Sequence, residues 1–170
     1  MKKILLAAFV GLSLTGCAAP NYETRTSTSN FDGTVSKGSV PALLSCKEWS
    51  EECPVLTFVS SSKDENTIGV AVEVLSQTNY YSLQKLAFNI DGKIIEAENN
   101  GLTEYKYNQY IRAKNSEAMF VMPREIISEM KSANRIWVKV STLQHGAFER
   151  SMLENGIESK AYKALKAFNP

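Results

Sequence analysis

The chain of 170 residues carries 19 basic and 18 acidic side chains, which gives a formal net charge of +1 at neutral pH. Such a balance supplies no strong electrostatic attraction to nucleic acid or to anionic lipid. The sequence also contains no arginine cluster and no basic recognition helix, so nucleic acid is excluded as a partner.

The first seventeen residues have the layout of an export signal. Lys2 and Lys3 provide a positive start, residues 4–14 form an apolar run, and small residues follow before Cys17. A charged start, an apolar run of roughly ten residues and a small-residue cleavage site are typical of a secretory signal peptide. The run is shorter than the about 20 apolar residues that a membrane-spanning helix needs. Removal of residues 1–16 leaves 17 of the 19 basic residues against 18 acidic ones.

The end of this signal, Leu14-Thr15-Gly16-Cys17, resembles the lipobox of bacterial lipoproteins. The resemblance implies that a diacylglycerol is attached to the Cys17 sulfur, that cleavage occurs just before Cys17, and that the new amine is acylated. Two or three acyl chains hold a protein stably at a bilayer, whereas one does not. Ala18, rather than Asp, is similar to the outer-membrane sorting choice of enteric-type bacteria. We therefore expect a lipid-anchored protein of the bacterial cell envelope, at the outer membrane; the alternative is a plain secretory signal in which Cys17 has no role.

Residues 17–40 are expected to be a lipidated, flexible tether. They are rich in Ser, Thr, Asn and Gly, and such a stretch has too little apolar surface to offset the entropy cost of ordering. The alternative is a segment that becomes ordered on a partner. Residues 41–170 are then a single domain of about 130 residues, which is enough for a hydrophobic core.

Cys46 and Cys53 are expected to form a disulfide, because an exported protein meets oxidising conditions and an even pair of cysteines favours pairing. Seven residues of straight helix would separate their Cα atoms by about 10 Å, whereas a disulfide needs them within about 7 Å. The segment between them must therefore curl into a loop. A closed loop this short contributes at most roughly 2–3 kcal/mol, so it fastens a local feature.

This loop carries Trp49 beside Glu48, Glu51 and Glu52. A tryptophan on a loop closed by a disulfide is preorganised for a partner, so Trp49 is a candidate partner-binding residue. The alternative is that Trp49 packs into the core.

Apolar and polar residues alternate along most of the remaining chain, which is typical of half-buried antiparallel strands. The alternation predicts strands over residues 55–59, 68–74, 86–90, 93–98, 102–111, 116–122, 135–142 and 147–153. Asp91-Gly92 lies between two of these strands and predicts a tight hairpin, because both turn residues must tolerate positive φ.

Helical spacing of apolar residues predicts two helices in the last third of the chain. The first has Pro123 at its first position. The second begins at Asn155, which would cap it while Glu158 returns the hydrogen bond. Its apolar face consists of Ile157, Ala161, Ala164, Leu165 and Phe168. The fold class is α+β, mainly β, with an antiparallel sheet of six to eight strands folded into a sandwich or a partly closed barrel.

The sequence has no recognisable catalytic or metal-binding centre, and we expect no cofactor and no enzymatic activity. His145 is the only histidine, it lies in an expected turn, and no nucleophile-elbow pattern is near it. One histidine and two paired cysteines do not make a zinc site. Two carboxylates that hydrolyse a sugar meet only in space and leave no local pattern, so this alternative stays open.

Five of the seven tyrosines fall in two short segments and are candidate partner-binding residues: Tyr80, Tyr81, Tyr105, Tyr107 and Tyr110. On a strand Tyr105 and Tyr107 share a face. Tyrosine offers a large contact area with a polar tip, which suits protein or glycan binding. The alternative is that these side chains pack over a sheet edge.

These features together predict a non-enzymatic envelope lipoprotein that acts as a protein-binding or assembly module. The expected ligand is another envelope protein or peptidoglycan. Two alternatives stay open: a cell-wall hydrolase or transferase with spatially convergent carboxylates, and an inhibitor of a lysozyme-like enzyme.

Overall fold

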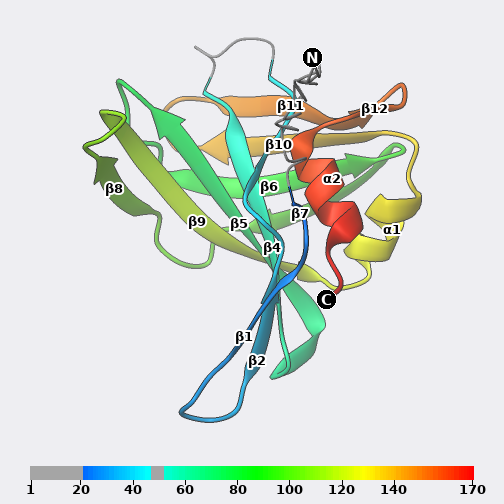
Figure 1. Cartoon of the computed structure of the whole chain (residues 1–170). Coiled ribbons are helices and arrows are strands. Elements are labelled where there is room, and N and C mark those ends of the chain that lie inside the picture. Colours follow the sequence, from blue (N-terminus) through cyan, green and yellow to red (C-terminus); the bar gives the residue numbers. More distant parts are fainter. Residues whose placement is uncertain (1–20, 47–51) are drawn as a thin grey trace, which may run out of the picture.

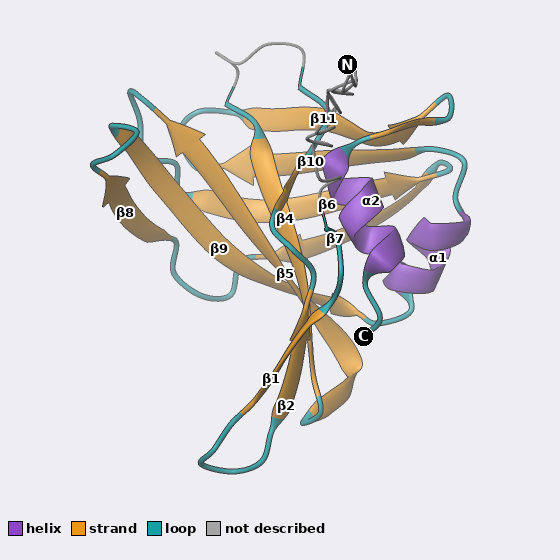
Figure 2. Cartoon of the chain, viewed as in Figure 1, coloured by secondary structure: helices purple, strands orange, loops and turns teal. Residues whose placement is uncertain are grey.

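The computed structural model describes residues 21–46 and 52–170. They form two antiparallel sheets and two helices (Figures 1 and 2). The seven-stranded sheet has the order β1-β2-β4-β5-β9-β8, with β3 also pairing to β4. Its strands are β1 (Arg25–Thr28), β2 (Val35–Gly38), β3 (Ala42–Leu43), β4 (Pro54–Ser61), β5 (Asp64–Ser76), β8 (Glu104–Asn108) and β9 (Ala113–Pro123).

The five-stranded sheet has the order β12-β11-β10-β6-β7 and lies behind the first sheet in Figure 2. Its strands are β6 (Leu83–Ile90), β7 (Lys93–Glu98), β10 (Ile136–Thr142), β11 (Ala147–Glu154) and β12 (Ile157–Glu158). The helices are α1 (Ile126–Ser132) and α2 (Lys160–Ala167). The mainly β, antiparallel fold class with two helices is confirmed, and the described residues contain more strands than the sequence predicts.

The core lies between the two sheets. One face of each long strand is buried, because successive side chains of a strand point to opposite sides. Phe58, Phe88 and Phe120 come from different strands and are fully buried in one continuous cluster. The helix α2 contacts β3, β4 and β11 and closes one open side of the sandwich (Figure 1). On the other side β6 and β7 approach β9.

The Asp91-Gly92 hairpin is confirmed. Asp91 has φ 49° and Gly92 has φ 98°, as a two-residue turn between β6 and β7 requires. The predicted start of the last helix is wrong. Asn155 (φ 52°) and Gly156 (φ 76°) form a second tight turn, between β11 and β12.

The helix α2 instead begins after Ser159, whose side chain accepts a hydrogen bond from the Tyr162 N–H at 3.1 Å. Ile157, which was expected on the apolar face of that helix, is an exposed residue of β12. The first helix is also shorter than predicted, because Pro123 still belongs to β9.

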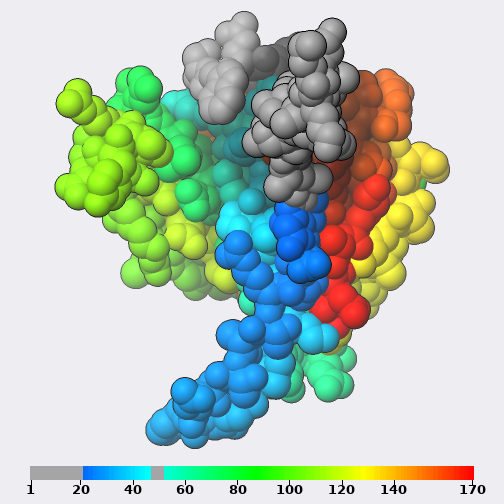
Figure 3. Space-filling model, viewed as in Figure 1, coloured from blue at the N-terminus to red at the C-terminus, as the bar shows by residue number. Residues whose placement is uncertain are grey.

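The segment that was predicted as a flexible tether is partly folded. Within it, β1 pairs with β2, and β2 pairs with the edge of β4. These pairings supply hydrogen bonds that the polar composition does not reveal. The β1–β2 hairpin and the β4–β5 turn beside it form an arm that projects from the body (Figures 1 and 3). An ion pair between Asp32 and Lys63 joins the two tips.

The start of the arm is fixed to the end of the chain. Thr24 Oγ1 donates to the carbonyl oxygen of Ala167 at 3.1 Å and accepts from the Asn169 N–H at 3.0 Å. Tyr22 packs against the hydrophobic core. The folded unit therefore begins well before residue 41. Neither helix of the described residues is long and apolar enough to cross a membrane.

Candidate functional site

Several residues that the sequence singles out can be located only in part. Cys17 and Trp49 lie outside the described residues. Cys46 and Cys53 form the expected disulfide, with their Cα atoms 6.0 Å apart, within the about 7 Å that such a bond requires.

Glu52, the residue before Cys53, connects the disulfide to the rest of the molecule. The Glu52 carboxylate accepts hydrogen bonds from Ser76 Oγ at 2.7 Å and from the Tyr81 hydroxyl. The Tyr81 ring packs edge-on against the rings of His145, at 5.1 Å, and Phe148, at 5.0 Å. The disulfide loop is thereby joined to both sheets.

Tyr81 differs from its expected role. Its side chain is only 3% exposed, so it packs inside the molecule and offers no surface to a partner. Burial, and then the hydrogen bond to Glu52, raise the pKa of the Tyr81 phenol above its usual value. Tyr80, the residue before it, is 39% exposed.

The other four tyrosines gather around β8. Tyr80, Tyr105, Tyr107 and Tyr110 are between 39% and 89% exposed. The rings of Tyr80 and Tyr105 meet edge to face at 5.4 Å, and the ammonium group of Lys114 lies 5.3 Å from the Tyr80 ring centre. We call these four residues the tyrosine surface. Figure 3 shows that β8 and the turn after it protrude from the body.

β8 itself is the last strand of its sheet, and all five of its residues are exposed. It pairs with β9 on one side, and within residues 21–46 and 52–170 no strand pairs with its other side. An edge strand of this kind offers unpaired main-chain groups to another polypeptide.

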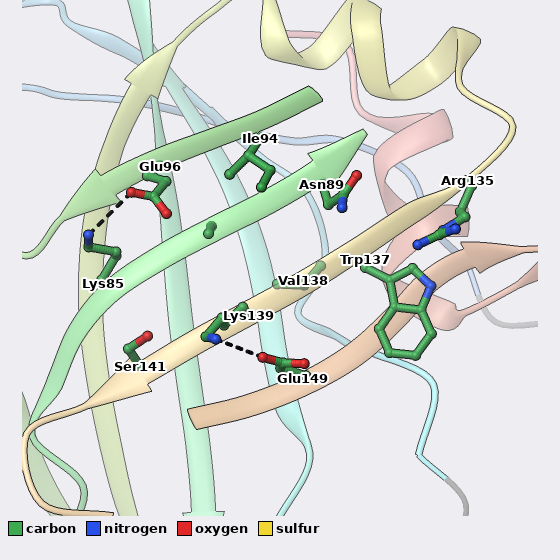
Figure 4. A pocket seen from close by; sticks show the side chains of 11 residues that line it. Lys85, Asn89, Ile94, Glu96, Arg135, Trp137, Val138, Lys139, Ser141 and Glu149 are labelled. Carbon is green, nitrogen blue, oxygen red and sulfur yellow. Dashed lines mark hydrogen bonds and ion pairs between the residues drawn. The ribbon is translucent and has the colours of Figure 1, made fainter. Parts of the chain in front are cut away.

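A hollow of about 540 Å³ lies on the outer face of the five-stranded sheet (Figure 4). The register of β7, β6, β10 and β11 aligns the side chains of this face in rows that run across the strands. One row consists of Ile94, Asn89, Trp137 and Ser151, and the next consists of Glu96, Ala87, Lys139 and Glu149. The sequence predicts the strand over residues 135–142, which carries Trp137 and Lys139, but does not reveal this site, since its rows join strands that are distant in sequence.

The two lysines of the hollow are neutralised by neighbouring carboxylates. Lys85 pairs with Glu96 at 3.2 Å and with Glu98 at 2.8 Å, and Lys139 pairs with Glu149 at 2.8 Å. The carboxylates raise the pKa of the Lys85 ammonium group, the bond to Glu98 contributing most. The carboxylates of the hollow, Glu96 and Glu149, are therefore ion-paired with lysines, which is not the arrangement of a general acid and a general base.

Another group of carboxylates lies elsewhere. Glu117 on β9 lies directly opposite Glu73 on β5 and Glu104 on β8. Lys106 Nζ contacts both Glu117 and Glu104 at 3.0 Å. Burial, and then the Glu117 charge, raise the pKa of Glu73. These carboxylates lie on the outer face of the seven-stranded sheet and do not line the hollow. The strand register brings them together, and the ion pairs with Lys106 offset part of their charge.

Within the part of the chain that the structure describes, no group of three or more His, Cys, Asp or Glu side chains is placed to hold a metal ion. Comparisons with models of protein families, with curated proteins and with solved structures found no match for this chain.

Proposed function

We propose that this protein is a lipid-anchored module of the bacterial cell envelope, at the outer membrane, that binds another envelope protein through its tyrosine surface. The observation that carries the proposal is the group of four exposed tyrosines on and beside the edge strand β8. Tyrosine is among the residues that contribute most to protein–protein binding energy, and its ring loses little conformational entropy on contact.

The arrangement of the rings supports a binding role over simple edge packing. Tyr80 and Tyr105 hold each other in an edge-to-face pair, and Lys114 lies over Tyr80 while its ammonium group donates to the Thr78 carbonyl at 2.6 Å. Rings that are already oriented cost less to immobilise when a partner arrives. The free edge of β8 adds main-chain hydrogen-bonding groups to the same surface.

The anchor rests on the lipobox-like end of the export signal. Diacylglycerol on the Cys17 sulfur and an acyl group on its amine would together give the two or more chains that stable attachment needs. Mass analysis of the amino-terminal peptide from native protein tests this half of the proposal. A peptide that begins at Cys17 and carries no fatty acid would contradict it.

The binding half is tested by site-specific photocrosslinking in intact cells. A photoreactive phenylalanine analogue in place of Tyr107 is expected to give one discrete crosslinked protein. The same analogue in place of Lys163, an exposed residue of α2, is the positional control and is expected to give none. The Tyr105→Ala change should weaken the Tyr107 crosslink, because it removes the neighbouring ring. Identical products from both positions, or none from Tyr107, would rule out the tyrosine surface.

A further inference from the structure

The shape of the hollow follows from one small residue. Ala87 occupies the middle of the outer face, with Lys139 opposite it on β10 and Glu96 opposite it on β7. Its methyl group leaves a depression that the longer neighbouring side chains surround. The resulting volume of about 540 Å³ lies within the usual range for small-molecule sites, about 300–1,000 Å³.

One end of the hollow has an aromatic ring in a fixed position. Trp137 is partly buried, and its indole N–H donates to Glu154 Oε1 at 3.1 Å. This bond orients the ring and occupies its only polar group. What remains for a ligand is the flat apolar surface of the indole, which suits the C–H face of a sugar ring.

Two lining side chains at the same end are free to donate hydrogen bonds. The Asn89 side-chain oxygen accepts from the Gly92 N–H at 2.9 Å, which leaves its NH₂ group to donate. The Arg135 guanidinium makes no hydrogen bond or ion pair within residues 21–46 and 52–170. Figure 4 shows Arg135, Trp137 and Asn89 together at this end, with Lys85 and Glu96 at the other.

The charges of the lining favour a ligand with a single negative group. Lys85 and Lys139 are paired with carboxylates, so Arg135 supplies the one uncompensated charge among the lining residues. The paired carboxylates Glu96 and Glu149 would repel a polyanion. Arginine binds a carboxylate through two parallel hydrogen bonds, which also fixes the orientation of the ligand.

We propose that the Trp137 hollow binds a saccharide that carries a carboxylate, with one sugar ring against Trp137 and the carboxylate on Arg135. This site is separate from the tyrosine surface and does not depend on the function proposed above. The chemistry is shared by two sources, a cell-wall glycan with a lactyl ether and a polysaccharide with uronic acids.

The test uses the full purified chain, with Trp49→Phe as background so that Trp137 alone reports by fluorescence. Three disaccharides are titrated: N-acetylglucosaminyl-N-acetylmuramic acid, a glucuronic acid–N-acetylglucosamine disaccharide, and neutral chitobiose. At least one acidic disaccharide is expected to saturate the signal, with a dissociation constant about 5–10 times lower than that of chitobiose. Saturation by the first alone assigns the cell-wall source, and saturation by the second alone assigns the uronic-acid source.

Arg135→Gln should remove the preference for the acidic ligand, so that the acidic and neutral disaccharides bind alike. Arg25→Gln, the same change on the exposed strand β1, is the matched control and should leave the preference intact. Trp137→Phe keeps a ring and is expected to weaken all three sugars, read by calorimetry. No saturable signal from either acidic disaccharide up to about 10 mM, equal binding of acidic and neutral sugars by the parent chain, or an unchanged preference in Arg135→Gln would each overturn the proposal.

Discussion

Replacing Phe168 with alanine tests whether α2 and the residue after it belong to the central core. The Phe168 ring is fully buried and stacks on Phe58, with ring centres 6.3 Å apart and planes 30° apart. A buried aromatic side chain removes about 150–250 Å² from water, which at about 25 cal/mol per Å² corresponds to roughly 4–6 kcal/mol. Partial relaxation of the neighbours lowers the expected loss of unfolding free energy to about 3–5 kcal/mol.

A loss of that size is a large fraction of the about 5–15 kcal/mol that holds a typical domain together. The measurement is urea unfolding followed by circular dichroism, with the free energy taken from midpoint and slope. Phe31→Ala is the matched control, because Phe31 is 98% exposed at the tip of the arm and its loss should change stability by less than about 0.5 kcal/mol. Should Phe168→Ala fail to fold, the milder Phe168→Leu is expected to cost about 1–2 kcal/mol. Equal midpoints for the Phe168 and Phe31 variants would refute the assignment of α2 to the core.

Three further outcomes can be measured on the same purified chain. Tyr81→Phe should cost about 1–1.5 kcal/mol, because it removes the hydroxyl that donates to Glu52. Since the folded pKa of Tyr81 is raised, the native state keeps a proton that the unfolded chain loses above about pH 10; stability should therefore fall at higher pH, and fall less steeply in Tyr81→Phe. Glu73→Gln should raise stability near pH 7 by a few tenths of a kcal/mol, because the Glu73 carboxylate is partly buried and faces Glu117. This gain should vanish below about pH 3, where the carboxyl is protonated in both the unfolded and the folded chain. A gain that is constant with pH would contradict the electrostatic cause. Reduction of the Cys46–Cys53 disulfide should lower the unfolding free energy by no more than about 2–3 kcal/mol and leave the far-ultraviolet spectrum unchanged, whereas global unfolding on reduction would show that the loop does more than fasten a local feature.

The sequence predicts a strand wherever one face of that strand is buried, because apolar and polar residues then alternate. Ile136, Val138 and Val140 alternate with Trp137, Lys139 and Ser141, and this alternation identifies β10 and its inner face. The strands of the arm lack this signal, because β1 is exposed on both faces and depends on pairing with β2 alone. Their existence is a consequence of the free edge of β4, which is not visible in the local sequence.

A short sequence motif can also be compatible with two different local structures, and the sequence alone then does not decide between them. Asn155-Gly156 is both a good helix start and a good two-residue hairpin turn. The pairing of β11 with β12 decides in favour of the turn. The Trp137 hollow lies beyond sequence reasoning for a related reason. Its rows bring Asn89 beside Trp137 and Ala87 beside Lys139, and only the strand register determines those neighbours.

The hydrogen bonds between Thr24 and the carboxy-terminal residues have a consequence for the proposed lipid anchor, because they fix the start of the folded unit close to Cys17. A tether of 24 residues would reach about 80 Å when fully extended, at roughly 3.5 Å per residue. Tyr22 already packs against the core, and only five peptide units, which span at most about 18 Å, separate it from Cys17. Lipid on Cys17 would thus hold the amino-terminal end of the folded unit within about 18 Å of the bilayer surface, far closer than a 24-residue tether allows.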